Sequence, residues 1–127
     1  MALFNKLFSK SSDNDNPLAW NSLVDDKSIH AVKENSHHKT QLIFKHSTRC
    51  GISRMTLKSF EKMLLEDDYS IDFHYLDLLN YRDLSNQISQ EFSVHHESPQ
   101  VLIIKNETCV FTASHYDITN IELQKFC

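Results

Sequence analysis

Hydrophobic and polar positions alternate along this chain in patterns that predict several strands. The segment 41–47 is apolar in the middle and polar at its ends, and 101–105 is almost wholly apolar, which is typical of buried strands. Strict alternation over 71–75 predicts a strand with two different faces. The polar pair 106–107 joins 101–105 to the segment 108–114, and this arrangement predicts a hairpin.

Other segments carry apolar residues at spacings of three and four, which predict helices. The clearest stripe runs from Ile52 to Leu64. Asp25 or Asp26 can supply the N-cap of an earlier helix. The predicted helices cover 29–36, 51–65 and 81–92, and a last one begins near Asp117 or Thr119.

A short strand is also predicted at 18–24, so the element order reads βαβαβαββα. Strands that alternate with helices, followed by a hairpin and a last helix, predict an α/β fold in which helices flank both faces of a central mixed sheet. We expect a single domain over 18–127. A short amphipathic start and a flexible polar linker precede it over 1–17.

The size and the net charge of the chain exclude several classes of function. A chain of 14.9 kDa with 40% hydrophobic residues suits one core. The balance of 13 Lys and Arg against 17 Asp and Glu gives a net charge of -4, the wrong sign for a general nucleic-acid binder. No apolar run approaches the roughly 20 residues of a spanning helix, and the start MALFNKLFSK lacks the features of a signal peptide. We therefore expect a cytoplasmic monomer with no nucleic-acid partner and no membrane span.

The three cysteines, Cys50, Cys109 and Cys127, form neither an even disulfide framework nor a metal-binding pair. The histidine pairs at 37–38 and 95–96 are sequence neighbours, a spacing that does not place both rings on one face of an element. We expect thiols in a reducing compartment and no metal site.

Cys50 falls where a predicted strand ends and a predicted helix begins, an edge where sites in α/β sheets commonly form. Unpaired backbone N–H groups and the helix dipole stabilise a thiolate at such a position. Arg49, with Lys45 and Arg54 nearby, acts in the same direction, and Ser53 can offer its hydroxyl or its backbone N–H to the sulfur. Cys50 is therefore the leading candidate for a reactive group.

The only glycine of the chain, Gly51, follows this cysteine directly. We interpret it as clearing the approach of a second sulfur to Cys50. The alternative is that glycine eases the turn from strand to helix. The pair Ser98-Pro99 precedes the strand at 101–105, where a proline is tolerated.

The segment HSTRCGIS at 46–53 follows QLIFK, and SPQVLIIKN follows some fifty residues later. Together they resemble the thioredoxin-like superfamily, and most closely the bacillithiol-system redox proteins of the YtxJ type, a monothiol bacilliredoxin group. The resemblance covers nearly the whole chain. It departs from the family at Gly51, where the family usually has proline.

The resemblance implies a thioredoxin-like fold and a role for each residue of the two segments. Cys50 would be the redox nucleophile, and Ser53 would stand where dithiol relatives carry the resolving cysteine. Pro99 would be a cis-proline that faces the site, and Ser98 would present its backbone groups to the thiol or substrate chain.

The implied activity is thiol–disulfide exchange that removes a low-molecular-weight thiol, here bacillithiol, from protein mixed disulfides. S-thiolated proteins would be the partners, bacillithiol the co-substrate, and no cofactor would be tightly bound. Arg49, Lys45 and His46 could attract the carboxylates of the thiol. Full solvation at a strand end is the alternative for each of these side chains.

Two other functions stay open at this point. The sequence CGIS is close to the CGFS signature of monothiol glutaredoxins that carry iron–sulfur clusters, although no glycine follows Pro99 to help hold glutathione. In a non-catalytic binding module, Cys50 would be a small buried hydrophobe. For Cys109 we expect structural packing, whereas Cys127 could resolve a mixed disulfide at Cys50 if the last helix ends near the site.

Overall fold

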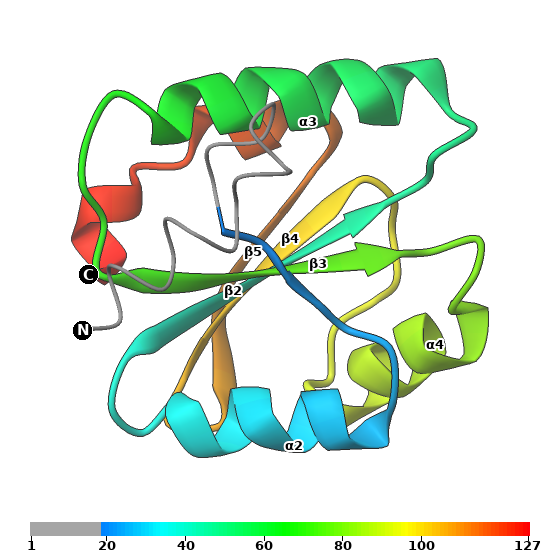
Figure 1. Ribbon diagram of the computed structural model, residues 1–127, viewed down its shortest axis with the longest axis vertical. Helices are drawn as coiled ribbons and strands as arrows, with labels where there is room; N and C mark the ends of the chain where they lie inside the picture. Colours follow the sequence, from blue (N-terminus) through cyan, green and yellow to red (C-terminus); the bar gives the residue numbers. More distant parts are fainter. Residues whose placement is uncertain (1–18) are drawn as a thin grey trace.

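The structure is a computed structural model that describes residues 19–127 (Figure 1). The predicted start and linker over 1–17 lie outside the described residues. Five strands form one sheet in the order β1-β3-β2-β4-β5. The elements are β1 (Asn21–Ser22), α2 (Asp26–Asn35), β2 (Thr40–His46), α3 (Gly51–Leu64), β3 (Ile71–Asp77), α4 (Arg82–Glu91), β4 (Gln100–Lys105), β5 (Thr108–Ser114), and the 3-10 helices η2 (His115–Asn120) and η3 (Leu123–Phe126).

The sheet is mixed, which confirms the predicted α/β class. Strands β1, β3 and β2 run parallel, β4 is antiparallel to β2, and β5 is antiparallel to β4. The end of β2 therefore lies beside the end of β3 and the beginning of β4, with His46 opposite Asp77 and Lys45 opposite Gln100. One edge of the sheet thus collects the α3 junction and the Ser98-Pro99 pair.

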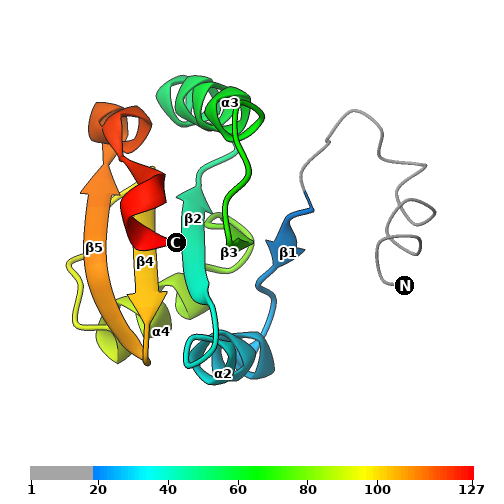
Figure 2. The ribbon, with the colours of Figure 1, turned by 90° about the vertical axis from the view of Figure 1, so that its left-hand side faces the viewer.

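Helices cover both faces of the sheet, and each face has its own core. Helix α3 and η2 lie over one face, and α2 and α4 lie over the other (Figures 1 and 2). Because neighbouring strand residues point to opposite faces, Phe44 packs with Phe60 of α3, whereas Ile43 packs with Ile88 of α4. Among residues 19–127, no helix is both long and apolar enough to cross a membrane.

Helix α2 begins where the sequence predicted one of two caps. Asp25 is the N-cap, and its carboxylate accepts the Ser28 N–H at 2.9 Å. Helix α3 also lies where it was predicted, but part of its apolar stripe faces outward. Ile52 and Met55 are exposed beside Cys50, and the helix buries Phe60 and Leu64 further along.

The prediction of a regular last helix is wrong. The chain after β5 forms the two short 3-10 helices η2 and η3. Ile121 lies between them in an extended conformation with φ -71° and ψ 132°. The apolar side chains of Ile118, Ile121 and Leu123 all enter the core under α3, and their spacing of three and then two residues does not suit one face of an α-helix.

Candidate active site

Cys50 is the N-cap residue of α3 and is partly exposed. Its carbonyl accepts the Arg54 N–H at 3.0 Å, and its own N–H donates to the Ser47 carbonyl at 3.1 Å. Its side chain makes no capping hydrogen bond. The N–H groups of the first helical turn are therefore open to a charged sulfur or to a ligand.

Ser53 lies one turn into α3, and its side chain is buried. The sequence suggested that Ser53 offers its hydroxyl or its backbone N–H to the Cys50 sulfur. The hydroxyl oxygen instead accepts the Ser47 N–H at 3.1 Å and lies 2.7 Å from Nδ1 of His46. Ser53 thus fastens the end of β2 to the first turn of α3.

His46 is buried as well, so neither the expected attraction of carboxylates nor the alternative of full solvation at the strand end applies to this side chain. Its ring lies 5.7 Å from Tyr75 and 6.4 Å from Phe44, measured between centroids, on the α3 face of the sheet. Burial lowers the pKa of His46, Arg54 acts in the same direction, and Asp77 acts in the opposite one. The imidazole is therefore neutral near pH 7.

Lys45 does not belong to this site, because it points to the opposite face of the sheet. The side chain is fully buried, and Nζ donates to the Ser85 carbonyl at 3.0 Å and to Ser89 Oγ at 2.9 Å. Nδ1 of His96 lies 3.4 Å away. Burial lowers the pKa of Lys45 to about 8. The expected contact between Lys45 and a thiol ligand is therefore wrong.

The exposed cations beside Cys50 are Arg49 and Arg54. Arg54 donates from Nη1 to the Thr48 carbonyl at 3.3 Å and so lies across the loop that leads to Cys50. Arg49 directly precedes the cysteine and is exposed. These two guanidinium groups, rather than Lys45 and His46, are placed to attract an anionic ligand at this edge.

The Ser98-Pro99 pair lies at the same edge, before β4. The peptide bond between the two residues is cis, as the resemblance implied, and Pro99 is buried. The Pro99 carbonyl accepts the His115 N–H at 3.0 Å, which ties this loop to the end of β5. Within residues 19–127, the buried Oγ of Ser98 has no hydrogen-bond partner.

The other two cysteines lie at the far end of the sheet. Cys109 is opposite Ile104, which is in turn opposite Gln41 near the start of β2, and burial raises the pKa of Cys109. Cys127 follows Phe126, whose carbonyl accepts the Thr40 hydroxyl at the beginning of β2. In Figure 1 the C-terminus is at the left, whereas α3 begins at the right.

The length of β2 alone excludes a disulfide from Cys50 to either thiol in this fold. The strand spans about 20 Å from Thr40 to His46, whereas the Cα atoms of a disulfide lie about 4.4–6.8 Å apart. Cys127 could have resolved a mixed disulfide at Cys50 only if the last helix ended near the site, and it ends at the other end of the sheet.

Gly51 is not required by the backbone. No glycine of the described chain has a positive φ, and a Cβ built at Gly51 would meet only Nη2 of Arg54, at 3.9 Å. The alternative that glycine eases the turn is thus disfavoured, because any residue can adopt this conformation. The open space around the missing side chain agrees with an approach path to Cys50.

We expect Gly51→Pro to raise the free energy of unfolding by about 0.4–1 kcal/mol, because proline reduces the freedom of the unfolded chain. Gly51 is the first helical residue, where proline is favoured, and its N–H makes no backbone hydrogen bond in the described chain. Cys50, with φ -100° and ψ 123°, already has the conformation required before proline. Urea unfolding measures the gain, and Gly51→Ala is the matched control; destabilisation by proline would contradict this account.

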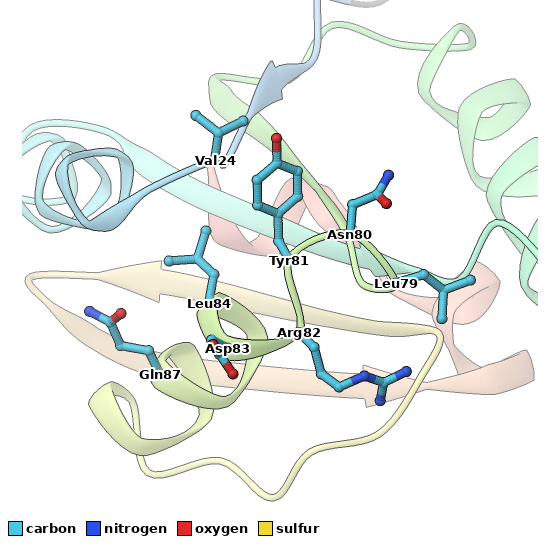
Figure 3. Close-up of a pocket in the computed structure, with 8 residues that line it drawn as sticks. All are labelled: Val24, Leu79, Asn80, Tyr81, Arg82, Asp83, Leu84 and Gln87. Atoms are coloured by element: carbon cyan, nitrogen blue, oxygen red, sulfur yellow. The ribbon is translucent and has the colours of Figure 1, made fainter.

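A hollow of about 460 Å³ lies apart from these residues, at the start of α4 (Figure 3). Its lining comes from Val24 and from the segment between the end of β3 and Gln87. None of the residues singled out from the sequence lines it. The residues of the candidate site therefore do not form this hollow.

The sequence patterns did not predict two contacts near this edge. The first is the bond between His46 and Ser53, and the second is the cluster of Lys45, Ser89 and His96. The alternation of strand residues was the available signal, since it places residues 44 and 46 on one face and 43 and 45 on the other. It could not say that polar side chains at 45 and 46 would be buried.

Comparisons of the chain with known protein families and solved structures agree with this geometry. A family model described as "Monothiol bacilliredoxin BrxC" matches residues 21–123. A solved structure described as having a thioredoxin fold is 35% identical, with a TM-score of 0.68, and the match covers 77% of this chain and 84% of the other.

Thioredoxins share the fold at lower identity. The thioredoxin pre-protein of Schistosoma mansoni is 20% identical with a TM-score of 0.65, covering 87% of this chain and 100% of its own. The thioredoxin of Trypanosoma brucei brucei is 11% identical with a TM-score of 0.64, covering 79% of this chain and 81% of its own. Because the family match spans most of the chain, and the fold it implies is the one observed, the chain belongs to the monothiol bacilliredoxin family and has a thiol redox role.

Proposed function

We propose that the protein is a monothiol thiol–disulfide oxidoreductase that removes bacillithiol from protein mixed disulfides, with Cys50 as the nucleophile. The observation that carries the proposal is the isolation of the Cys50 thiol. It is partly exposed at the start of α3, a serine stands one turn later, and both other cysteines lie at the far end of the sheet. An exchange centred on one thiol fits this arrangement.

The first step moves the small thiol from the protein substrate to Cys50. The Cys50 thiolate attacks the bacillithiol sulfur of the mixed disulfide, so that a bond from Cys50 to bacillithiol forms and the bond to the substrate cysteine breaks. The substrate cysteine leaves as a thiolate and takes a proton from water. The mixed disulfide is itself the oxidant, so this step needs no other electron acceptor.

The second step resets Cys50. A second bacillithiol, as thiolate, attacks the bacillithiol sulfur bound to Cys50 and releases the symmetric disulfide of bacillithiol together with the Cys50 thiolate. In sum, one mixed disulfide and one thiol give one protein thiol and one small disulfide. The Ser53 hydroxyl cannot replace the second thiol, because it forms no disulfide.

Residues around Cys50 supply binding and electrostatics in this scheme. The open N–H groups of the first turn of α3 stabilise the attacking and departing sulfur charge. The exposed guanidinium groups of Arg49 and Arg54 attract carboxylates of the thiol. The backbone of Ser98, before the cis-proline, lies at the same edge to receive the ligand or substrate chain.

Intact mass spectrometry tests the identity of the thiol. The reduced protein is incubated with oxidised bacillithiol and, separately, with oxidised glutathione, and the modified peptide is mapped. We expect a bacillithiol adduct on Cys50 that forms at least about tenfold faster than the glutathione adduct, a difference near 1.4 kcal/mol in transition-state binding. Added bacillithiol should then release the adduct.

Other outcomes contradict the proposal in distinguishable ways. A glutathione preference with a coloured, cluster-bearing dimer would favour iron–sulfur carriage. No adduct with either thiol, together with a Cys50 that resists alkylation, would favour a non-catalytic binding module. An adduct confined to Cys127 would identify reaction of an exposed terminal thiol.

A further inference from the structure

The hydrogen bonds of the Ser53 hydroxyl can be assigned one by one. The Ser47 N–H, at 3.1 Å, can only donate, so the Ser53 oxygen accepts there. The remaining contact is Nδ1 of His46 at 2.7 Å. We assign the hydroxyl proton to Nδ1, because the Ser53 hydroxyl contacts no other hydrogen-bond acceptor within residues 19–127, and this assignment leaves Nδ1 without a proton.

The surroundings of His46 keep it in that form. The side chain is 4% exposed and lies among Phe44, Tyr75 and Ser53. The charged groups that face it are Arg54 of α3 and Asp77 of β3, and they oppose each other. Burial is the largest effect and disfavours the charged imidazolium. These effects favour a neutral His46 near pH 7, and the assignment of the Ser53 proton to Nδ1 then puts the imidazole proton on Nε2.

We propose that His46 is a positioning residue that keeps the Ser53 hydroxyl turned away from the Cys50 sulfur. Ser53 is the third residue of α3 and follows the N-cap residue Cys50 by three positions, a spacing at which side chains on a helix are neighbours. The contact with His46 directs the hydroxyl inward instead. The inference rests on the proposed function, in which the Cys50 sulfur is the attacking atom.

The effect on reactivity follows from what a hydrogen bond does to a thiolate. A hydroxyl that donates to the sulfur stabilises its charge and weakens its attack, since nucleophilicity falls as the thiolate is stabilised. Without His46, the proton of Ser53 would change its acceptor from Nδ1 to Sγ, and no bond to hydrogen would break. His46 therefore preserves the nucleophilicity of the Cys50 thiolate, the property that is measured once the thiol is fully ionised, without touching the substrate.

A double-mutant cycle tests the proposal on His46→Phe, Ser53→Ala and the double variant. The phenyl ring keeps the packing against Tyr75 but has no acceptor. The readout is alkylation of Cys50 by iodoacetamide, followed on its own peptide at pH 10, where even an ordinary cysteine is mostly thiolate. We expect His46→Phe to slow alkylation about 3- to 10-fold, and the double variant to react at the rate of Ser53→Ala.

His74→Phe is the matched control, because His74 is also buried in the sheet but points to the opposite face, where Nε2 contacts Gln41 at 2.7 Å. It should leave the alkylation rate of Cys50 within about twofold. The proposal would be overturned if His46→Phe and His74→Phe slowed the alkylation of Cys50 equally. It would also be overturned if the double variant reacted as slowly as His46→Phe, because His46 would then have only a structural role.

Nitrogen chemical shifts of the histidine rings give a second test that needs no variant. At pH 7 we expect Nδ1 of His46 to be unprotonated and Nε2 to carry the proton, and a proton on Nδ1 would overturn the assignment. Neither measurement uses bacillithiol. Each can therefore contradict this inference without contradicting the proposed function, and the adduct experiment can do the reverse.

Discussion

The rate of mixed-disulfide exchange should fall on the order of 10³-fold or more when Cys50 is replaced by serine. The thiolate is the nucleophile in this chemistry, and a serine hydroxyl neither ionises near neutral pH nor forms a disulfide. The measurement is the release of bacillithiol from an S-thiolated protein, followed by mass at fixed concentrations. The folded state of the variant is verified by circular dichroism.

Cys109→Ser and Cys127→Ser are the matched controls for this variant. Both cysteines lie at the end of the sheet where β2 begins, and the length of β2, about 20 Å, separates that end from Cys50. We expect each control to retain the exchange rate within about twofold. A large loss in either control, with the fold intact, would mean that a second cysteine participates and that the exchange does not rest on one thiol.

The second large effect concerns stability. Lys45→Met should raise the free energy of unfolding at pH 7 by about 1–3 kcal/mol. The ammonium group is fully buried, and its contacts are a carbonyl, a hydroxyl and an imidazole, with no carboxylate among its hydrogen-bond partners in the described chain. Methionine fills a similar volume without a charge to desolvate.

The pKa shift of Lys45 determines how the free energy of unfolding changes with pH. The pKa of Lys45 is about 8 in the folded protein and 10.5 in the reference state. Between these two pH values the unfolded chain binds more protons at Lys45 than the folded chain does. The free energy of unfolding therefore rises with pH over this range. The full difference corresponds to about 3 kcal/mol, an upper bound before relaxation of the site.

Urea unfolding at pH 7 and at pH 10 measures both quantities. The advantage of Lys45→Met over the parent protein should be largest at pH 7 and should shrink at pH 10. Lys58→Met, on the exposed side of α3, is the control and should change stability by about 0.5 kcal/mol or less at either pH. Destabilisation by Lys45→Met at pH 7 would show that the three hydrogen bonds outweigh the cost of burying the charge.

The sequence predicted the regular part of the fold because strand and helix periods differ clearly over 41–47, 51–65 and 101–105. The location proposed for the candidate site followed from topology. The ends of parallel strands share an edge, so Cys50 was expected there before any contact was known. The cis peptide before Pro99 came from the family resemblance and not from physical reasoning on the chain.

The remaining features depend on tertiary contacts that a single chain does not display. Lys45 and His46 appear polar, and polar residues at a strand end are ordinarily solvated, yet partners from α4 and α3 bury both. The segment after β5 follows the core rather than a helical period, because Ile118 and Leu123 must both pack under α3. In each case distant residues overrode the local preference.

In the proposed exchange, the separation of Cys50 from Cys109 and Cys127 sets the kinetic order of the step that resets Cys50. A resolving thiol within the same chain would open the mixed disulfide at a rate independent of the surrounding solution. Here the second thiol must arrive from solution by collision. The lifetime of the loaded protein, in which Cys50 carries the small thiol, is therefore inversely proportional to the concentration of free small thiol. When that pool is depleted, the loaded form accumulates, and turnover of the protein then follows the reducing capacity of its surroundings.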